Sequence, residues 1–361
     1  MIIRSVEPKE YSTMKNFKNS RLRKQSVGID VASDTLDVCI GAVNLHDQFN
    51  FSSSKTFANS SQEFHQILDW IQTQVEDPEN IWFVMEATGV YYEELAYFLH
   101  ETDCQVCVLV ANRAKHYAQS LPIKSKTDAI DARILARYGL ERTPIAWNPA
   151  SEKLRQIKLL VRERHQLKQQ RTRLKNQLHA ARQRWQHPHS SMQRLTDHIE
   201  QINEYLRQIG QELEQLWQSD QQLSEPIKRI AQVGGIGKKT VLEVIAETNG
   251  FALVTNRNQL ASYAGLDVVI DQSGKRIGAT KISKQGNVHI RQTLYMPAVC
   301  ASQHNRALQA FYKRLVAKHP DRKKIALVAV MRKLLLLIYS LWKSGQTYDP
   351  KRHYQQITEE A

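Results

Sequence analysis

Hydrophobic residues in the first 150 positions fall into short apolar runs of strand length, separated by stretches with helical spacing. The runs predict strands over residues 26–31, 36–43, 49–57, 81–86 and 106–110. Helices are predicted over residues 60–74, 91–100 and 127–138, and Ser60 and Glu63 have the spacing of a capping box at the first of them. Only four residues link the first two strands, which indicates a hairpin.

This order of elements is typical of a mixed α/β domain that begins with antiparallel strands. No GxGxxG motif follows the first strand, which argues against a doubly wound dinucleotide fold. We therefore predict a ribonuclease-H-like domain over residues 26–149. Residues 1–25 lack periodicity and carry net positive charge, so we expect them to form a basic flexible arm.

Residues 150–227 repeat hydrophobic positions at helical spacing on both sides of Pro188. We predict two long helices that form a coiled-coil hairpin or an oligomerisation arm. The first helix is strongly basic and the second acidic. The two helices could pair with each other, the first could lie along nucleic acid, or the charges could simply be a solvated face.

The helical spacing of apolar positions over residues 228–345 predicts a third, mainly helical domain. Residues 346–361 are expected to form a tail. The helices of this third domain are expected up to about Thr248, over 288–318 and over 323–343, with a mixed segment at 260–285. The glycine-rich turn at 233–237 resembles a helix–hairpin–helix turn. Its free N–H groups at a helix start would suit a phosphate, and Lys238 and Lys239 add positive charge. A plain turn between two helices is at least as common.

Charge adds a class of partner to this picture. The 361-residue chain has a formal net charge of +14 and a sequence pI of about 9.5, which favours a polyanionic partner such as nucleic acid. Residues 1–150 hold 15 basic and 19 acidic groups, whereas residues 228–361 hold 22 and 8. The acidic first part is better suited to binding divalent metal than to binding DNA by charge alone.

Four cysteines, Cys39, Cys104, Cys107 and Cys300, are too few for a disulfide framework in a chain of this length. Cys104 and Cys107 have CxxC spacing without a second pair, so we expect buried thiols instead of a zinc site. No N-terminal signal sequence is visible. The apolar run at 334–341 is too short to span a bilayer. These features predict a cytoplasmic protein.

Four carboxylates carry the first candidate chemistry. Asp30 lies near the end of the first strand in GID, Glu86 ends the strand at 81–86 in MEATG, and Asp128 and Asp131 lie three residues apart in KTDAIDA. Strand ends and one helical face can bring them together, and hard oxygen ligands of this kind suit Mg²⁺ or Mn²⁺. Each one alone could be a surface residue or a helix cap. Asp34 and Asp37 are interpreted as turn and strand-surface residues.

The order GID…EATG…KTDAIDA resembles the DEDD-type transposases of insertion sequences, a family that includes Piv-like recombinases and whose N-terminal domain is similar to RuvC. The likeness runs from about residue 26 to 345. It continues in VGGIGKKT (233–240), NQLASYAGL (258–266) and GNVHIRQTLYMPA (286–298), which resemble the C-terminal transposase domain of that family.

The resemblance implies a serine nucleophile within DVVIDQSGKRIGATKIS (267–283), and the match falls on Ser273. Ser262, Ser283 and Thr280 are competitors, and Ser273-Gly274 taken alone would be a hairpin turn. Five basic residues surround the serine and are candidate phosphate ligands, with or without a catalytic role: Lys275, Arg276, Lys281, Lys284 and Arg291. No histidine adjoins Ser273, so metal held by the carboxylates could activate it.

The family likeness implies metal-dependent DNA strand exchange through a covalent phosphoserine intermediate. It also implies a homo-oligomer, expected to be a tetramer on two DNA sites, and a noncoding bridge RNA that pairs with target and donor DNA. Such a protein would act at the prokaryotic nucleoid. Two rival readings remain: a metal-dependent junction endonuclease that needs no serine, and a non-enzymatic nucleic-acid-binding scaffold.

Overall fold

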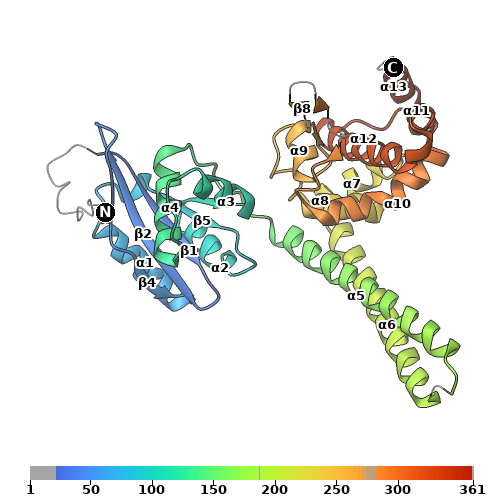
Figure 1. Cartoon of the computed structure of the whole chain (residues 1–361), viewed down its shortest axis with the longest axis horizontal. Coiled ribbons are helices and arrows are strands. Elements are labelled where there is room, and N and C mark those ends of the chain that lie inside the picture. Colours follow the sequence, from blue (N-terminus) through green and yellow to red (C-terminus); the bar gives the residue numbers. More distant parts are fainter. Residues whose placement is uncertain (1–21, 187, 271, 274–275, 278–280, 360–361) are drawn as a thin grey trace, which may run out of the picture. The chain divides into compact units, whose positions relative to one another are not determined.

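The structure is a computed structural model that describes residues 22–186, 188–270, 272–273, 276–277 and 281–359. The chain forms two compact units, Met1–Pro149 and Ala150–Ala361 (Figure 1).

The first unit is built on a mixed sheet whose strands are β1 (Leu22–Val31), β2 (Thr35–Asn44), β3 (Phe49–Phe51), β4 (Lys55–Ala58), β5 (Trp82–Glu86) and β6 (Gln105–Leu109). The order is β3-β2-β1-β5-β6, with β4 also paired to β2. β1 and β2 form an antiparallel hairpin, whereas β5 and β6 run parallel to β1. The predicted mixed α/β pattern with antiparallel strands first is confirmed. The ribonuclease-H-like assignment stays a prediction.

Helices cover both faces of this sheet, which is why the middle of its central strand β1, residues 26–29, is buried. Helix α1 (Ser61–Gln72) and helix α2 (Glu93–Glu101) share one hydrophobic cluster with Val27 and Ile29 of β1. Helix α3 (Ala111–Gln119) and helix α4 (Asp128–Glu141) pack on the other face, against Val84 and Cys107. A short 3-10 turn, η2 (Pro78–Asn80), precedes β5.

Several sequence expectations for this unit need correction. β1 begins at Leu22, so the last residues of the expected flexible arm belong to the sheet, while residues 1–21 lie outside the described residues. The strand predicted at 49–57 is two strands, β3 and β4, and α3 was not predicted. The capping box at α1 is wrong. Ser60 precedes the helix but its side chain makes no cap hydrogen bond, and the Glu63 carboxylate accepts from Gln66 Nε2 at 2.9 Å instead.

The second unit begins with two long helices, α5 (Glu152–Gln183) and α6 (His189–Gln218). They run antiparallel and pack along each other, with Arg171 Nη1 donating to Asn203 Oδ1 at 2.9 Å. The break lies at Pro188, where the loss of a backbone N–H favours a new helix start. That these helices form a supercoil remains a prediction.

The rest of the unit surrounds a single large core of buried aliphatic side chains. Its helices are α7 (Gln221–Ile230), α8 (Lys238–Glu247), α9 (Arg257–Tyr263), α10 (Val288–His304), α11 (Arg306–Lys318), η3 (Pro320–Arg322), α12 (Lys323–Ser344) and α13 (Pro350–Glu359). Among the described residues between α9 and α10 there are four two-residue strands: β7 (Val268–Val269), β8 (Gln272–Ser273), β9 (Arg276–Ile277) and β10 (Lys281–Ile282). Residues 350–359 were expected in a tail, but they form α13, which packs on α11.

One helical stretch of the described residues, Pro320–Ser344, is long and apolar enough to cross a membrane by length and composition. The apolar run at 334–341 is therefore part of a longer apolar helix than the sequence indicated. Half of the apolar window is buried, and the helix packs on α10 and α11 within the core of the second unit. A core helix satisfies the same test, so this finding is weak evidence for a membrane span.

Candidate active site

The four predicted carboxylates meet where α4 crosses the sheet, and glycines make that crossing possible. A Cβ atom added to Gly28 of β1 would lie 2.0 Å from the Ala132 carbonyl oxygen, and one added to Gly139 of α4 would lie 1.9 Å from Ser26 Oγ. The helix therefore rests directly on β1. Because side chains alternate along a strand, Asp30 points to the same face as Gly28. That face carries the first turn of α4, where Asp128 and Asp131 lie.

Glu86 reaches the same face from the neighbouring strand. β5 runs parallel to β1 with Ile29 opposite Met85, so Glu86 ends β5 beside Asp30. Val84, two residues earlier, faces Gly139 of α4, and alternation places Glu86 on that side too. The carboxyl ends of two parallel strands and the amino end of one helix thus bring Asp30, Glu86 and Asp131 together.

The electrostatics of this cluster show that its negative charges are only partly compensated. Burial and the charges of Asp131, Asp128, Glu86 and Asp37, in that order, raise the pKa of Asp30 to about 6. Burial and Asp131 also raise the pKa of Glu86, and burial raises that of Asp131. Lys126 opposes this effect, with its Nζ 3.8 Å from Asp131 Oδ2. Thr127, not Asp128, caps α4 through its side chain.

The donor set fits a hard divalent cation, because carboxylate oxygens are the ligands Mg²⁺ and Mn²⁺ prefer. The placing of the side chains does not by itself make a coordination site. Among the described residues, no three His, Cys, Asp or Glu side chains stand in an arrangement that could hold a metal ion. The expectation of buried thiols in the CxxC pair holds for Cys107, whereas Cys104 is half-buried.

Ser273 belongs to the second unit. It is exposed and ends β8, where it pairs with Arg276 of β9. Ser283 differs from it because its hydroxyl is bound to the Asp267 carboxylate. Ser262 is exposed in α9, and Thr280 lies outside the described residues. Between α9 and α10, the side chain of Ser273 is therefore more accessible than that of Ser283.

The predicted phosphate ligands occupy different environments. Lys238 and Lys239 are exposed in the first turn of α8, and Lys281 and Lys284 are exposed after the β8–β9 hairpin. Lys275 lies outside the described residues, as does the side chain of Arg276. Arg291 is half-buried, and its Nη1 donates to the carbonyl oxygens of Ala264 at 2.9 Å, Gly286 at 3.2 Å and Asn287 at 3.3 Å.

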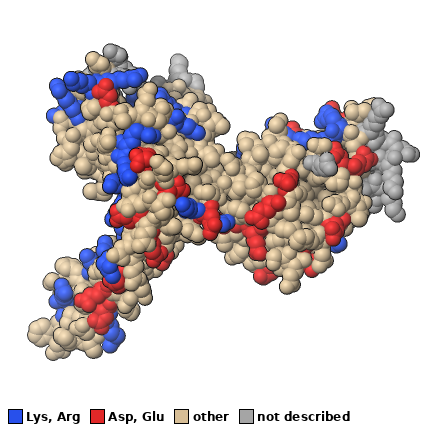
Figure 2. Space-filling model, turned by 180° about the vertical axis from the view of Figure 1, so that it is seen from behind, with Lys and Arg blue, Asp and Glu red and all other residues tan. Residues whose placement is uncertain are grey.

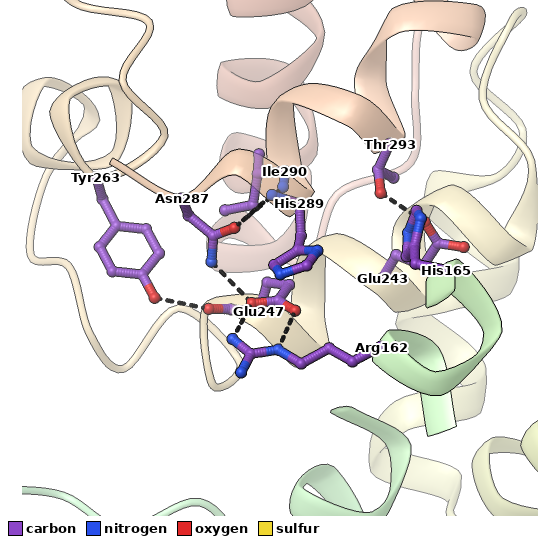
Figure 3. A network of polar contacts seen from close by, with 9 residues as sticks. All are labelled: Arg162, His165, Glu243, Glu247, Tyr263, Asn287, His289, Ile290 and Thr293. Atoms are coloured by element: carbon purple, nitrogen blue, oxygen red, sulfur yellow. Dashed lines mark hydrogen bonds and ion pairs between the residues drawn. The ribbon is translucent and has the colours of Figure 1, made fainter. Parts of the chain in front are cut away.

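Sequence reasoning missed a buried polar network between α5, α8 and α10 (Figure 3). It centres on two glutamates of α8, Glu243 and Glu247, which are 6% and 1% exposed. Arginines 162 and 164 of α5 bind them. Burying a carboxylate costs free energy unless it is paired with a positive charge. The sequence signal for this network was the pair of glutamates four residues apart in EVIAE (243–247), within an apolar helix and matched by the basic residues of α5.

A basic surface, defined here as residues 306–343 on α11, η3 and α12, was also missed. This stretch holds ten Lys and Arg residues and one acidic residue, Asp321. Lys318, Arg322, Lys323 and Lys324 are exposed at the turn between the two helices. Figure 2 shows Lys and Arg side chains gathered at the end of the second unit opposite the arm helices.

Comparisons with known proteins identify the family of the chain. A family model of transposases matches residues 27–185, and the model of the transposase IS116/IS110/IS902 family matches residues 227–313. The pilin gene-inverting proteins of Moraxella bovis and Moraxella lacunata are each 32% identical over 334 residues, which cover 92% of this chain and all of theirs. The chain belongs to the IS116/IS110/IS902 transposase family.

The family assignment confirms that the chain is an enzyme of DNA transposition or recombination. A solved structure, T. thermophilus RuvC in complex with Holliday junction substrate, is 13% identical and covers 34% of this chain and 99% of its own, at a TM-score of 0.25. So low a TM-score adds nothing to the assignment. The first match runs from the first unit into α5 and contains the four carboxylates, whereas the second match lies in the second unit and contains Ser273.

Proposed function

We propose that this transposase cuts and rejoins DNA strands with Asp30, Glu86, Asp128 and Asp131 as ligands of a divalent metal and Ser273 as nucleophile. The observation that carries the proposal is the shared face of β1, β5 and α4, on which burial and then like charges raise the pKa of Asp30 to about 6. A cluster that repels itself costs stability, and a cation that it binds would remove that cost.

Bound at these carboxylates, Mg²⁺ or Mn²⁺ would supply a Lewis acid for phosphodiester chemistry. The residues themselves have separate tasks. The fixed strand ends carry Asp30 and Glu86, whose positions are set by the sheet. Asp131 comes from α4, and Lys126 beside it limits the negative charge of the cluster.

The serine step exchanges one phosphate ester for another. Ser273 Oγ attacks the scissile phosphorus, and a serine–phosphate bond forms as the bond to one sugar oxygen breaks. The serine proton is lost and the departing sugar oxygen gains one, so no oxidant or energy source is needed. A sugar hydroxyl from the second DNA strand then attacks the phosphoserine and restores the serine.

Positive charge in the second unit supports this step. Lys281 and Lys284 are exposed beside the hairpin, and the first turn of α8 presents Lys238, Lys239 and free backbone N–H groups. These groups would bind DNA phosphates and stabilise negative charge on the reacting one.

The family likeness extends the proposal to partners. We infer a homo-oligomer, taken as a tetramer on two DNA sites, and a noncoding bridge RNA that selects them. The relatives' name, pilin gene-inverting protein, makes inversion of a DNA segment a possible outcome beside transposition. The basic charge of the second unit suits sequence-independent contact with nucleic-acid backbones.

A covalent-capture assay tests the proposal. Labelled duplex DNA from the flanks of the chain's own gene, with RNA transcribed from those flanks, is incubated with protein and Mg²⁺, denatured and run on a gel. We expect a protein–DNA adduct with the wild type and none with Ser273→Ala or Asp30→Ala. Ser262→Ala is the matched control and should keep the adduct.

Other outcomes identify the rival functions. Cleavage without an adduct, unchanged in Ser273→Ala, would mean a metal-dependent junction endonuclease. Binding of both nucleic acids without cleavage at any metal concentration would mean a scaffold.

A further inference from the structure

Glu243 and Glu247 lie one turn apart on the same face of α8, and each is bound by an arginine of α5. Arg162 donates from Nε to Glu247 Oε1 at 2.9 Å and from Nη2 to Oε2 at 3.0 Å. Arg164 Nη2 donates to Glu243 Oε1. The two pairs therefore join the same two helices, and both carboxylates are buried, although the side chain of Arg162 is 41% exposed and that of Arg164 7%.

Glu247 has contacts that reach the segment between α9 and α10, residues 264–287, which carries Ser273. The side chain of Asn287, at the far end of this segment, donates to Glu247 Oε2 at 2.7 Å. The hydroxyl of Tyr263, at the near end, donates to the Glu247 backbone carbonyl at 2.9 Å (Figure 3). One residue of α8 thus holds both ends of the serine-bearing segment.

The two ends of the segment are also bound to each other. The backbone N–H of Asn287 donates to the Tyr263 carbonyl at 2.7 Å, and that of Lys284 donates to the Gly265 carbonyl at 3.2 Å. A Cβ atom on Gly286 would lie 2.5 Å from the Tyr263 carbonyl oxygen, so only glycine permits this approach. The base of the segment is a closed, tightly packed loop, and Ser273 lies at its exposed part.

Glu243 has no such connection. Its carboxylate receives hydrogen bonds from Thr293 of α10 at 2.5 Å and from His165 of α5 at 3.2 Å. Both partners lie within helices. Glu243 therefore joins the helices, whereas Glu247 joins the helices to the serine-bearing segment.

We propose that Glu247 is a positioning residue for Ser273: with Arg162 and Asn287 it fixes the base of segment 264–287 against α5. This inference rests on the proposed function for its consequence in catalysis, and its structural part can be tested separately. The physical reason is that a bidentate arginine–carboxylate pair fixes orientation as well as distance. An error of about 1 Å in the place of a nucleophile can cost about 100-fold in rate.

The test compares Glu247→Gln with Glu243→Gln in the full chain. Both substitutions remove one buried negative charge from the same face of α8, so a merely structural role predicts equal effects. We expect Glu247→Gln to slow single-turnover adduct formation roughly 10- to 100-fold, with the DNA dissociation constant within about 2-fold of wild type. Glu243→Gln should lower the unfolding temperature comparably and leave the adduct rate, per folded molecule, close to wild type.

Amide hydrogen exchange in the protein without DNA tests whether Glu247 fixes the base of segment 264–287, and this test does not depend on catalysis. The amides of β7 and β10, at residues 268–269 and 281–282, should exchange faster in Glu247→Gln and at the wild-type rate in Glu243→Gln. Arg162→Lys keeps the positive charge but cannot form the bidentate pair with Glu247. We expect its rate of adduct formation to lie between those of the wild type and Glu247→Gln.

Equal rates of adduct formation in Glu247→Gln and Glu243→Gln, or unchanged exchange at β7 and β10, would overturn the proposal. If wild-type protein forms no adduct through Ser273, the proposed function fails. The exchange measurement then still decides whether Glu247 fixes this segment.

Discussion

Asp30 is a residue whose chemistry works against the stability of its own domain. It ends a buried strand among carboxylates, and burial together with their charges raises its pKa to about 6. At neutral pH it is nevertheless ionised and repels its neighbours. Sites that bind a substrate or a metal commonly carry such uncompensated charge, which a bound cation offsets.

Replacing Asp30 with Asn should stabilise the protein in the absence of divalent metal. The change removes repulsion from Asp131, Asp128 and Glu86, and we expect about 1 kcal/mol after allowance for solvent screening. Thermal unfolding in EDTA measures it. With Mg²⁺ present, the wild type should gain stability and the variant should gain little.

Asp34→Asn is the matched control, since Asp34 is exposed in the turn after β1. The same chemical change there should alter unfolding in neither condition. A lower unfolding temperature for Asp30→Asn in EDTA would contradict the interpretation of the cluster as self-repelling.

At the scale of elements, α5 and α8 are joined by buried ion pairs rather than by apolar packing alone. Burial by itself would raise the pKa of Glu243. The hydrogen bond from His165, the charge of Arg164 and the hydrogen bond from Thr293 outweigh burial and lower this pKa to about 2. The second unit therefore depends on a carboxylate that must stay ionised.

Acid should weaken this unit over a defined range. Because the pKa of Glu243 is lower in the folded protein than its ordinary value of 4.5, its contribution is complete above pH 4.5 and is lost as the pH falls towards 2. The difference corresponds to at most about 3 kcal/mol. Unfolding temperatures at pH 5.5 and pH 3 measure the loss.

Glu243→Gln should show a smaller fall between these two pH values than the wild type. Glu225→Gln, at an exposed position paired with Lys228, should show the wild-type fall. An identical acid response in all three proteins would refute this role of Glu243.

At the scale of the whole molecule, charge separates the two units. Residues 1–150 have four more acidic than basic groups, whereas residues 228–361 have fourteen more basic than acidic groups. The acidic part holds the carboxylate cluster, and the basic part holds Ser273 and the basic surface at residues 306–343. We expect the protein to bind DNA backbones mainly through the second unit.

The double variant Lys323→Glu with Lys324→Glu tests this division. Both side chains are exposed on the basic surface. DNA affinity should fall, and the slope of log affinity against log salt should decrease by about one for each DNA phosphate that the variant no longer binds. Fluorescence anisotropy with labelled duplex DNA measures both.

Arg113→Glu with Lys115→Glu changes the charge equally on exposed residues of α3 in the first unit. It should leave the salt slope unchanged. Equal reductions of affinity in both double variants would show that net charge, and not the basic surface, governs binding.

The sequence by itself determined most of the order of the strands and helices, and it selected four carboxylates, of which the structure brings Asp30, Glu86 and Asp131 to one face. Period-two and period-3.6 patterns are local, and the acidic residues stand at recognisable strand ends and at one helix start. The predicted ends of these elements were less accurate than their order. α3 was missed, and the predicted capping box gave way to other hydrogen bonds, because weak local preferences yield to tertiary contacts.

Only the tertiary structure decided how distant residues meet. Gly28 and Gly139 let α4 rest on β1, which brings Asp131 to Asp30 from a hundred positions away. Arg291, expected at a phosphate, instead binds the carbonyls of Ala264 and Gly286. Glu247 joins Arg162 to Asn287 across more than a hundred residues. No local pattern encodes such contacts, since each depends on the packing of elements that only the folded chain brings together.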